Sequence, residues 1–125
     1  MNTPANLKYT ENDEWFDPAT GKMGLTDYAQ SQLSDIVFVE MLVEVGDTVE
    51  AGKPIASVES VKASAETYAS AGGEVVEVND ALADGPEVLN SDPYGEGWMV
   101  KVTDGQPGKL MDAAAYETFC EGREH

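Results

Sequence analysis

The sequence has few of the residues on which most enzyme active sites depend. Cys120 is the only cysteine among its 125 residues, and His125 is the only histidine. A disulfide within the chain is therefore excluded, and neither a Cys/His metal site nor a Cys-His or Ser-His catalytic pair is expected. Cys120 itself is expected to be a partly buried residue of a C-terminal helix, with a redox role as the alternative.

Long apolar runs and basic residues are also scarce. No stretch approaches the roughly eighteen apolar residues of a membrane-spanning helix, and residues 1–7 resemble neither a signal peptide nor a transit peptide. Seven basic residues against 24 acidic ones give a formal net charge of −17, which repels phosphate backbones and anionic lipid. Neither nucleic acid nor a membrane is therefore an expected partner. The charge serves either solubility alone or also the steering of the chain onto basic protein surfaces.

The length and the spacing of turn residues indicate one small domain rich in strands. A chain of 125 residues with 42% hydrophobic content suits a single compact core. Short apolar runs between Gly and Pro residues favour strands over helices, and strands are predicted at 14–16, 22–25 and 36–40. Asp17–Gly21 is predicted to form the turn between the first two.

Two segments have the pattern of short helices. Residues 27–33 carry Asp27 and Gln30 at capping-box spacing, followed by an apolar face. Residues 112–121 are rich in alanine and other helix formers, and Gly122 lies where a helix stop is expected. We therefore predict a peripheral helix at each position.

The middle of the chain contains an internal repeat. Val43–Ile55 aligns with Val76–Val88, and five of the thirteen positions are identical, against roughly one expected by chance. Each copy is predicted as strand, turn, short strand, turn and strand. Neither copy can bury its apolar side alone, so the two are expected to pack face to face as a flattened β sandwich with pseudo-twofold symmetry.

The segment between the two copies is predicted to be a hairpin with a lysine at its tip. Ile55–Glu59 and Ser64–Tyr68 form its arms, and Ser60–Ala63 forms the tip. Lys62 would project outward between small residues, where a modifying enzyme can reach its amine, and loop tips on rigid scaffolds often carry function. The alternative is an ordinary solvated lysine, one of six in the chain.

The hairpin tip resembles the lipoylation site of the glycine cleavage H-protein family, and the resemblance extends over nearly the whole chain. Lipoyl domains of 2-oxo acid dehydrogenases typically have Asp-Lys-Ala at this turn and biotin carriers have Met-Lys-Met, whereas this chain has Val61-Lys62-Ala63. The stretches that carry the resemblance are Glu59–Ala63, Leu7–Tyr9, Glu14–Trp15, Gly24–Gln30, Val37–Glu40, Gly73–Val75, Val78–Asn79, Leu89–Gly95, Gly97–Trp98 and Leu110–Tyr116.

Four positions depart from the family pattern. Asp13 stands where histidine is common, Ser34 where glycine is usual, and Val43 and Ser70 where proline is common. These changes affect local turn geometry, and Asp13 alters the charge near the expected cofactor cleft. None of them touches Lys62.

The resemblance implies a mainly β fold of the biotinyl/lipoyl-domain superfamily. This fold is a barrel-sandwich hybrid with pseudo-twofold symmetry and short peripheral helices, including one at the C-terminus. It also implies a single lipoyl-carrier domain over residues 1–125, with its core at about 20–103 and a C-terminal helix at about 112–121.

The resemblance further implies a carrier of lipoate, covalently attached to Lys62, with no catalytic activity of its own. The carrier would take the aminomethyl group of glycine from the pyridoxal-phosphate-dependent glycine decarboxylase (P-protein) to the tetrahydrofolate-dependent aminomethyltransferase (T-protein). Dihydrolipoyl dehydrogenase (L-protein) would receive the electrons, and a lipoate ligase or octanoyltransferase would attach the cofactor. The cofactor supplies the chemistry, and the protein supplies attachment and presentation.

Other functions and settings remain open at this point. The chain could instead relay lipoyl or octanoyl groups to other lipoate-dependent proteins, or act as an enzyme. A monomer in a bacterial cytoplasm is expected, and a mature chain in the mitochondrial matrix is the alternative.

The resemblance also assigns residues around the cofactor. Glu14 and Glu66 match acidic positions of the cleft that receives the loaded arm, where a carboxylate can pair with a protonated amine; the alternative for both is solvated surface charge. Trp15 and Trp98 are expected in the core. The neighbours of Lys62 in the modification motif are Glu59, Ser60, Val61 and Ala63.

Overall fold

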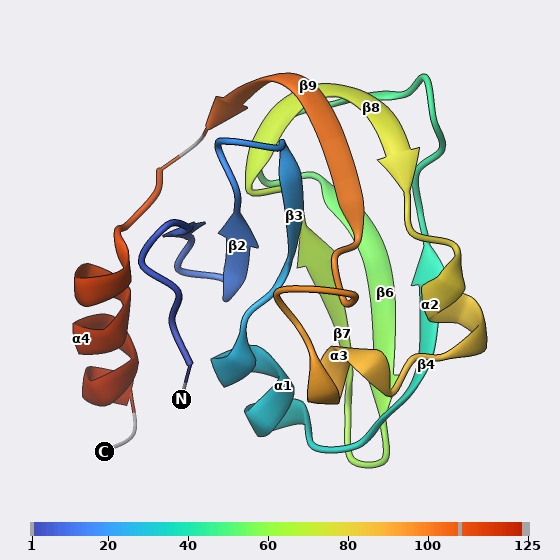
Figure 1. Cartoon of the computed structure of the whole chain (residues 1–125). Helices are drawn as coiled ribbons and strands as arrows, with labels where there is room; N and C mark the ends of the chain where they lie inside the picture. The colour runs from blue at the N-terminus through green and yellow to red at the C-terminus, as the bar shows by residue number, and fades with distance from the viewer. Residues whose placement is uncertain (1, 108, 124–125) are drawn as a thin grey trace.

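Two antiparallel sheets form most of the structure, a computed structural model that describes residues 2–107 and 109–123 (Figure 1). The larger sheet has the order β1 (Lys8–Tyr9), β2 (Glu14–Phe16), β3 (Lys22–Leu25), β9 (Val100–Pro107), β8 (Ala71–Val78) and β5 (Thr48–Val49). The smaller sheet has the order β4 (Ile36–Met41), β6 (Pro54–Ser60) and β7 (Ser64–Tyr68). The mainly β fold class is thus confirmed, as are the strands predicted at 14–16, 22–25 and 36–40.

The turn between β2 and β3 forms as predicted. The Gly21 amide donates to the Asp17 carbonyl at 2.8 Å, and Gly21 has φ +84°. A Cβ at this position would lie 2.1 Å from the Val102 carbonyl oxygen. Only glycine therefore permits both the left-handed backbone and the close approach of the chain to β9.

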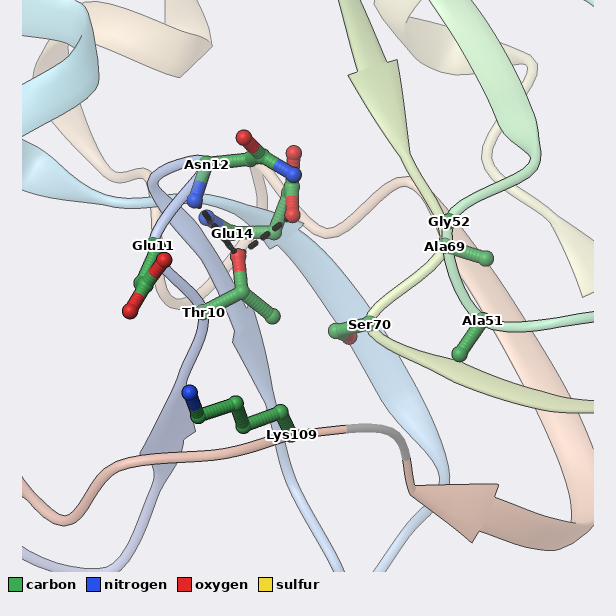
Figure 2. A pocket seen from close by; sticks show the side chains of 9 residues that line it. All are labelled: Thr10, Glu11, Asn12, Glu14, Ala51, Gly52, Ala69, Ser70 and Lys109. Carbon is green, nitrogen blue, oxygen red and sulfur yellow. Dashed lines mark hydrogen bonds between the residues drawn. The ribbon is translucent and has the colours of Figure 1, made fainter.

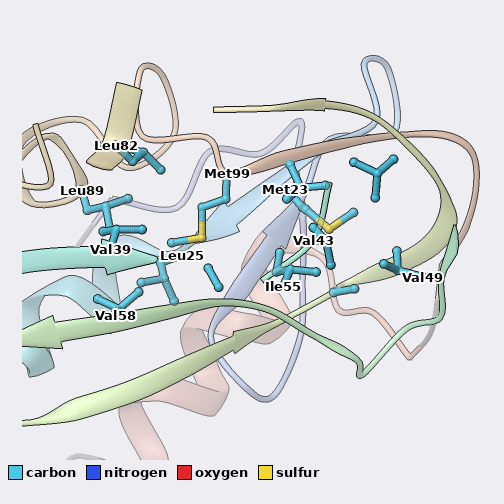
Figure 3. Close-up of a cluster of buried hydrophobic side chains, with 14 of the residues drawn as sticks. Met23, Leu25, Val39, Val43, Val49, Ile55, Val58, Leu82, Leu89 and Met99 are labelled. Atoms are coloured by element: carbon cyan, nitrogen blue, oxygen red, sulfur yellow. The ribbon is translucent and has the colours of Figure 1, made fainter. Parts of the chain in front are cut away.

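The main core lies between the two sheets (Figure 3). Val39 of β4 pairs with Val58 of β6, and both side chains are buried against residues such as Met23 and Met99. Their strand neighbours Phe38, Glu40 and Glu59 are exposed and Ser57 is half-buried, which is the alternation of a sheet with one covered face. This packing fixes the β6–β7 hairpin to the body of the protein.

The two repeat copies share buried positions but not secondary structure. Val49 of β5 and its equivalent Leu82 are both buried, yet Leu82 lies in helix α2 (Ala81–Asp84) instead of the predicted short strand. The last predicted strand is also wrong, because Val88 begins helix α3 (Val88–Ser91). The Ala-Leu-Ala sequence of α2 favours a helix, whereas Thr48-Val49 favours a strand. Residues 43–45 likewise form no strand.

Helix α1 (Asp27–Leu33) has the predicted bounds but a different cap. The N-cap is Thr26, whose hydroxyl accepts the Ala29 amide at 3.1 Å. Asp27 and Gln30 bond to each other through their side chains at 2.7 Å. The cap therefore lies one residue before the predicted one, because threonine is itself a good N-cap.

The C-terminal helix α4 (Ala113–Arg123) packs beside β1 and runs past Gly122, which was predicted to stop it. Cys120 is fully buried rather than partly buried. The rings of Tyr9 and Tyr116 stack with centroids 4.8 Å apart in a second buried cluster. Among the described residues, no helix is long and apolar enough to cross a membrane.

Candidate functional site

The predicted hairpin forms, and its tip is a two-residue turn that presents Lys62. The Ser60 amide donates to the Ala63 carbonyl at 2.8 Å and closes the turn. The Ser60 hydroxyl oxygen also accepts the amides of Lys62 at 3.2 Å and Ala63 at 3.0 Å. Ser60 therefore organises the turn through its side chain as well as its backbone.

Lys62 is exposed at this tip, and its neighbours Val61 and Ala63 are exposed with it. In the part of the chain that the structure describes, no salt bridge involves Lys62. A solvent-facing amine on a rigid turn with small neighbours can enter the active site of an acylating enzyme. The residues present therefore fit the covalent attachment of an acyl group.

A pocket of about 290 Å³ lies at the other end of β7 (Figure 2). Its size is at the lower end of the range for ligand sites, which suits a small group. The lining residues are Thr10, Glu11, Asn12, Glu14, Ala51, Gly52, Ala69, Ser70 and Lys109.

Glu14 is the buried carboxylate of this pocket, with 1% of its surface exposed. The Thr10 hydroxyl donates to Oε1 at 2.5 Å, and the Tyr68 amide donates to Oε2 at 3.2 Å. Burial raises the pKa of Glu14 to about 7, although both hydrogen bonds oppose this shift. These two bonds use two of the about four acceptor positions of a carboxylate. The solvated alternative for Glu14 is therefore wrong.

Glu66 lies in different surroundings. It is exposed on β7, opposite Ser57 of β6, and it does not line the pocket. One residue, Thr67, separates it from Tyr68, whose amide bonds to Glu14. The structure therefore does not bring the two predicted carboxylates into one cavity.

Thr10 and Ser70 line the pocket, but the sequence assigned neither residue to the site, and Ser70 was noted only as a departure from the family pattern. The Thr10 hydroxyl accepts the amides of Asn12 and Glu14, both at 3.2 Å, so it holds the whole loop before β2. Ser70 donates to the Trp15 carbonyl at 3.0 Å. The sequence pattern that could have identified Thr10 is a threonine followed by polar residues before a strand. Ser70 is brought in only by tertiary structure.

Asp13, which departs from the family pattern, is held by the C-terminal helix. It has φ +67° and accepts from the Arg123 guanidinium at 2.6 and 2.9 Å and from the Tyr116 hydroxyl at 2.9 Å. Its own carbonyl accepts the Thr26 amide at 3.0 Å. Asp13, directly before Glu14 in the sequence, is thus held by hydrogen bonds to Arg123, Tyr116 and Thr26. Its negative charge is paired with the positive charge of Arg123.

Comparisons with known proteins identify the family of the chain. The family model described as glycine cleavage H-protein matches residues 7–123, which is most of the chain. The chain belongs to the glycine cleavage H-protein family.

Relatives of this H-protein chain match it over almost their full length. A glycine cleavage system H protein of a Psychrobacter species is 53% identical over 127 residues, covering 99% of this chain and 95% of its own. One from Anaeromyxobacter sp. (strain K) is 46% identical over 129 residues, with 99% and 100% covered. The crystal structure of a glycine cleavage system H protein from Mycobacterium marinum superposes with a TM-score of 0.87 at 38% identity, covering 94% and 98%.

Proposed function

We propose that this chain is a non-catalytic lipoyl carrier of glycine cleavage, with lipoate in amide linkage to Lys62. The observation that carries the proposal is the exposed lysine on the closed turn between β6 and β7. When bound, lipoate supplies a disulfide that can accept the aminomethyl group of glycine and two electrons. The protein holds the attachment point rigid, so that the arm alone moves.

The pocket around Glu14 is the proposed resting place of the amine-bearing arm. Lys62 lies in the turn before β7 and Tyr68 lies at the end of β7, six residues farther on, or about 20 Å at about 3.3 Å per residue. A lysine side chain plus lipoyl chain of about a dozen bonds extends about 15 Å. With the amine of the cargo and the Glu14 side chain added, the length of the arm is comparable to the distance from Lys62 to Tyr68. A buried carboxylate then receives a cation, which is a strong pairing.

Further parts of the function follow from the family. The proposed partners are the P-, T- and L-proteins of glycine cleavage and a lipoate ligase or octanoyltransferase, with the chain acting as one monomeric domain. Because the relatives named above are bacterial, a bacterial cytoplasm is the proposed location. Tethering of the arm raises its local concentration at each docked partner.

Attachment at Lys62 is tested by incubating the unmodified protein with ATP, lipoate and a lipoate ligase, followed by intact and peptide mass analysis. We expect one lipoyl group, on the peptide containing Lys62, and none on Lys62→Arg, because a guanidinium cannot form the amide. The variant should fold normally, since an exposed tip side chain buries little. It should also abolish glycine-to-carbon-dioxide exchange. Modification of Lys53 or Lys101 instead would refute the assignment.

A further inference from the structure

A β-bulge exposes two consecutive hydrophobic residues at the start of β4. The pairing of β4 with β6 shifts register between Ile36 and Phe38, and Val37 occupies the extra position. In a regular strand, one of two neighbouring residues would face the core. Here Val37 is 55% exposed and Phe38 is 48% exposed, while Ile36 and Val39 remain buried. Bulges often re-aim side chains next to functional sites.

These two residues lie beside the hairpin tip. Phe38 is the cross-strand partner of Glu59, which is three residues before Lys62. The Val61 amide donates to the Asp35 carbonyl at 3.0 Å, so the turn is bonded to the segment that leads into β4. Val61 is itself 67% exposed. Val37, Phe38 and Val61 are called the loading surface below.

Apart from Lys62 itself, the charged side chains on the three strands around the loading surface are acidic. Side chains on the outer face of the small sheet alternate with the buried Val39 and Val58, and they include Glu40 and Glu59. Glu66 is exposed on the neighbouring strand β7. The sequences of β4, β6 and β7 contain no lysine or arginine. An apolar centre with an acidic rim is complementary to an apolar recess edged by basic residues.

We propose that the loading surface is the docking site for the enzyme that acylates Lys62, and that this enzyme carries such a recess. The inference rests on the proposed function. In the transfer, an amide bond forms between Lys62 Nζ and the lipoyl carbonyl carbon, the bond from that carbon to the adenylate oxygen breaks, AMP leaves and the amine loses a proton. The amine lies within one side-chain length of the turn, so the loading enzyme has to cover the residues beside it.

The enzymes that use the cofactor act at the far end of an arm about 15 Å long. Their reacting atoms therefore lie farther from the turn than those of the loading enzyme. Because of this difference in reach, we assign the loading surface to the loading enzyme and not to the decarboxylase.

The test compares attachment kinetics on the unmodified full chain, with a lipoate ligase, ATP and lipoate, read by intact mass. Phe38→Ser should lower kcat/KM at least tenfold, mainly through KM, and Val37→Ser should act in the same direction. Val45→Ser is the matched control, because Val45 is 64% exposed but lies outside the loading surface, and it should stay within twofold of wild type. Equal kcat/KM for Phe38→Ser and Val45→Ser would overturn the inference. Thermal unfolding checks that each variant is folded.

A second measurement separates loading from use. Each variant is driven to complete lipoylation with excess ligase, confirmed by mass, and then assayed with the decarboxylase. Exchange rates within twofold of wild type are expected. A loss of exchange that parallels the loss of loading would overturn the assignment to the loading enzyme. If wild type takes no lipoate on Lys62, the proposed function itself fails, whereas normal loading of wild type and both variants refutes only the docking site.

Discussion

Replacing Glu14 by glutamine should shorten the life of the aminomethyl cargo on the protein. The substitution keeps the shape of the side chain and one acceptor oxygen for the Tyr68 amide, but it removes the negative charge and the second acceptor oxygen, to which the Thr10 hydroxyl donates. A charge-assisted hydrogen bond is worth about 1.5–3 kcal/mol. Since about 1.4 kcal/mol is a factor of ten, cargo should be released about 10- to 100-fold faster if escape from the pocket limits its decay.

The pH dependence provides a second, sharper signature of Glu14. With a pKa of about 7 in the empty pocket, about nine in ten Glu14 side chains are ionised at pH 8 and about one in ten at pH 6. The protection of wild type relative to Glu14→Gln should therefore be about tenfold smaller at pH 6 than at pH 8. The variant has no carboxyl at this position, so its own decay should lack that step.

The assay is ammonia release from purified, loaded protein without tetrahydrofolate or partner enzymes. Glu11→Gln is the matched control, because Glu11 lines the same pocket but is exposed. Glu66→Gln tests the second predicted carboxylate, and its exposure limits the expected effect to about twofold. Equal decay of wild type and Glu14→Gln at pH 8 would show that the pocket protects by excluding water and not by charge.

Three further predictions concern pH, the C-terminal helix and salt. Because folding raises the pKa of Glu14 from 4.5 to about 7, its contribution to stability is present below pH 4.5 and is lost as pH rises through 7. Denaturant unfolding should show wild type losing about 3 kcal/mol more than Glu14→Gln between pH 4 and pH 8; parallel losses would exclude the raised pKa. Arg123→Gln should lower the unfolding free energy by about 1 kcal/mol, since the pair with Asp13 is partly exposed. Arg123→Gln should also move the pH midpoint of cargo protection upward. Without Arg123, the charge of Asp13 has lost its partner and raises the pKa of the neighbouring Glu14 further. An unmoved midpoint contradicts this coupling. Finally, the apparent KM of the decarboxylase for this chain should rise with salt, because screening shortens the range of the electrostatic field to about 10 Å at 0.1 M. A KM that does not change with salt would mean that the net charge of −17 serves solubility and not steering.

The features predicted correctly from sequence depend on local signals. The turn at Asp17–Gly21 needs only its own residues, and the β6–β7 hairpin is defined by apolar arms around a short polar tip. Helix α1 has the predicted bounds because its apolar face is continuous. Its cap was misassigned because Thr26 and Asp27 are adjacent and both residue types favour N-caps.

The features that were missed depend on contacts between distant parts of the chain. Arg123 and Asp13 are separated by 110 residues, and no local pattern links them. The second repeat copy keeps its buried Leu82 but forms a helix there, so equivalent burial did not imply equivalent backbone. All three residues of β2, including Glu14, are buried, because the strand is covered on both faces, and alternation alone does not predict this.

The position of β7 at the edge of its sheet explains how one strand serves both ends of the site. In the order β4, β6, β7, the outer side of β7 has no strand partner in that sheet. Its backbone groups there are available, and the Tyr68 amide uses this freedom to bond to Glu14. A further strand on this side would satisfy the Tyr68 amide and leave the buried carboxylate with only its bond to Thr10. The same edge position leaves the hairpin free to project, so that Lys62 stays exposed while Glu14, in the pocket that the arm is proposed to reach, stays buried.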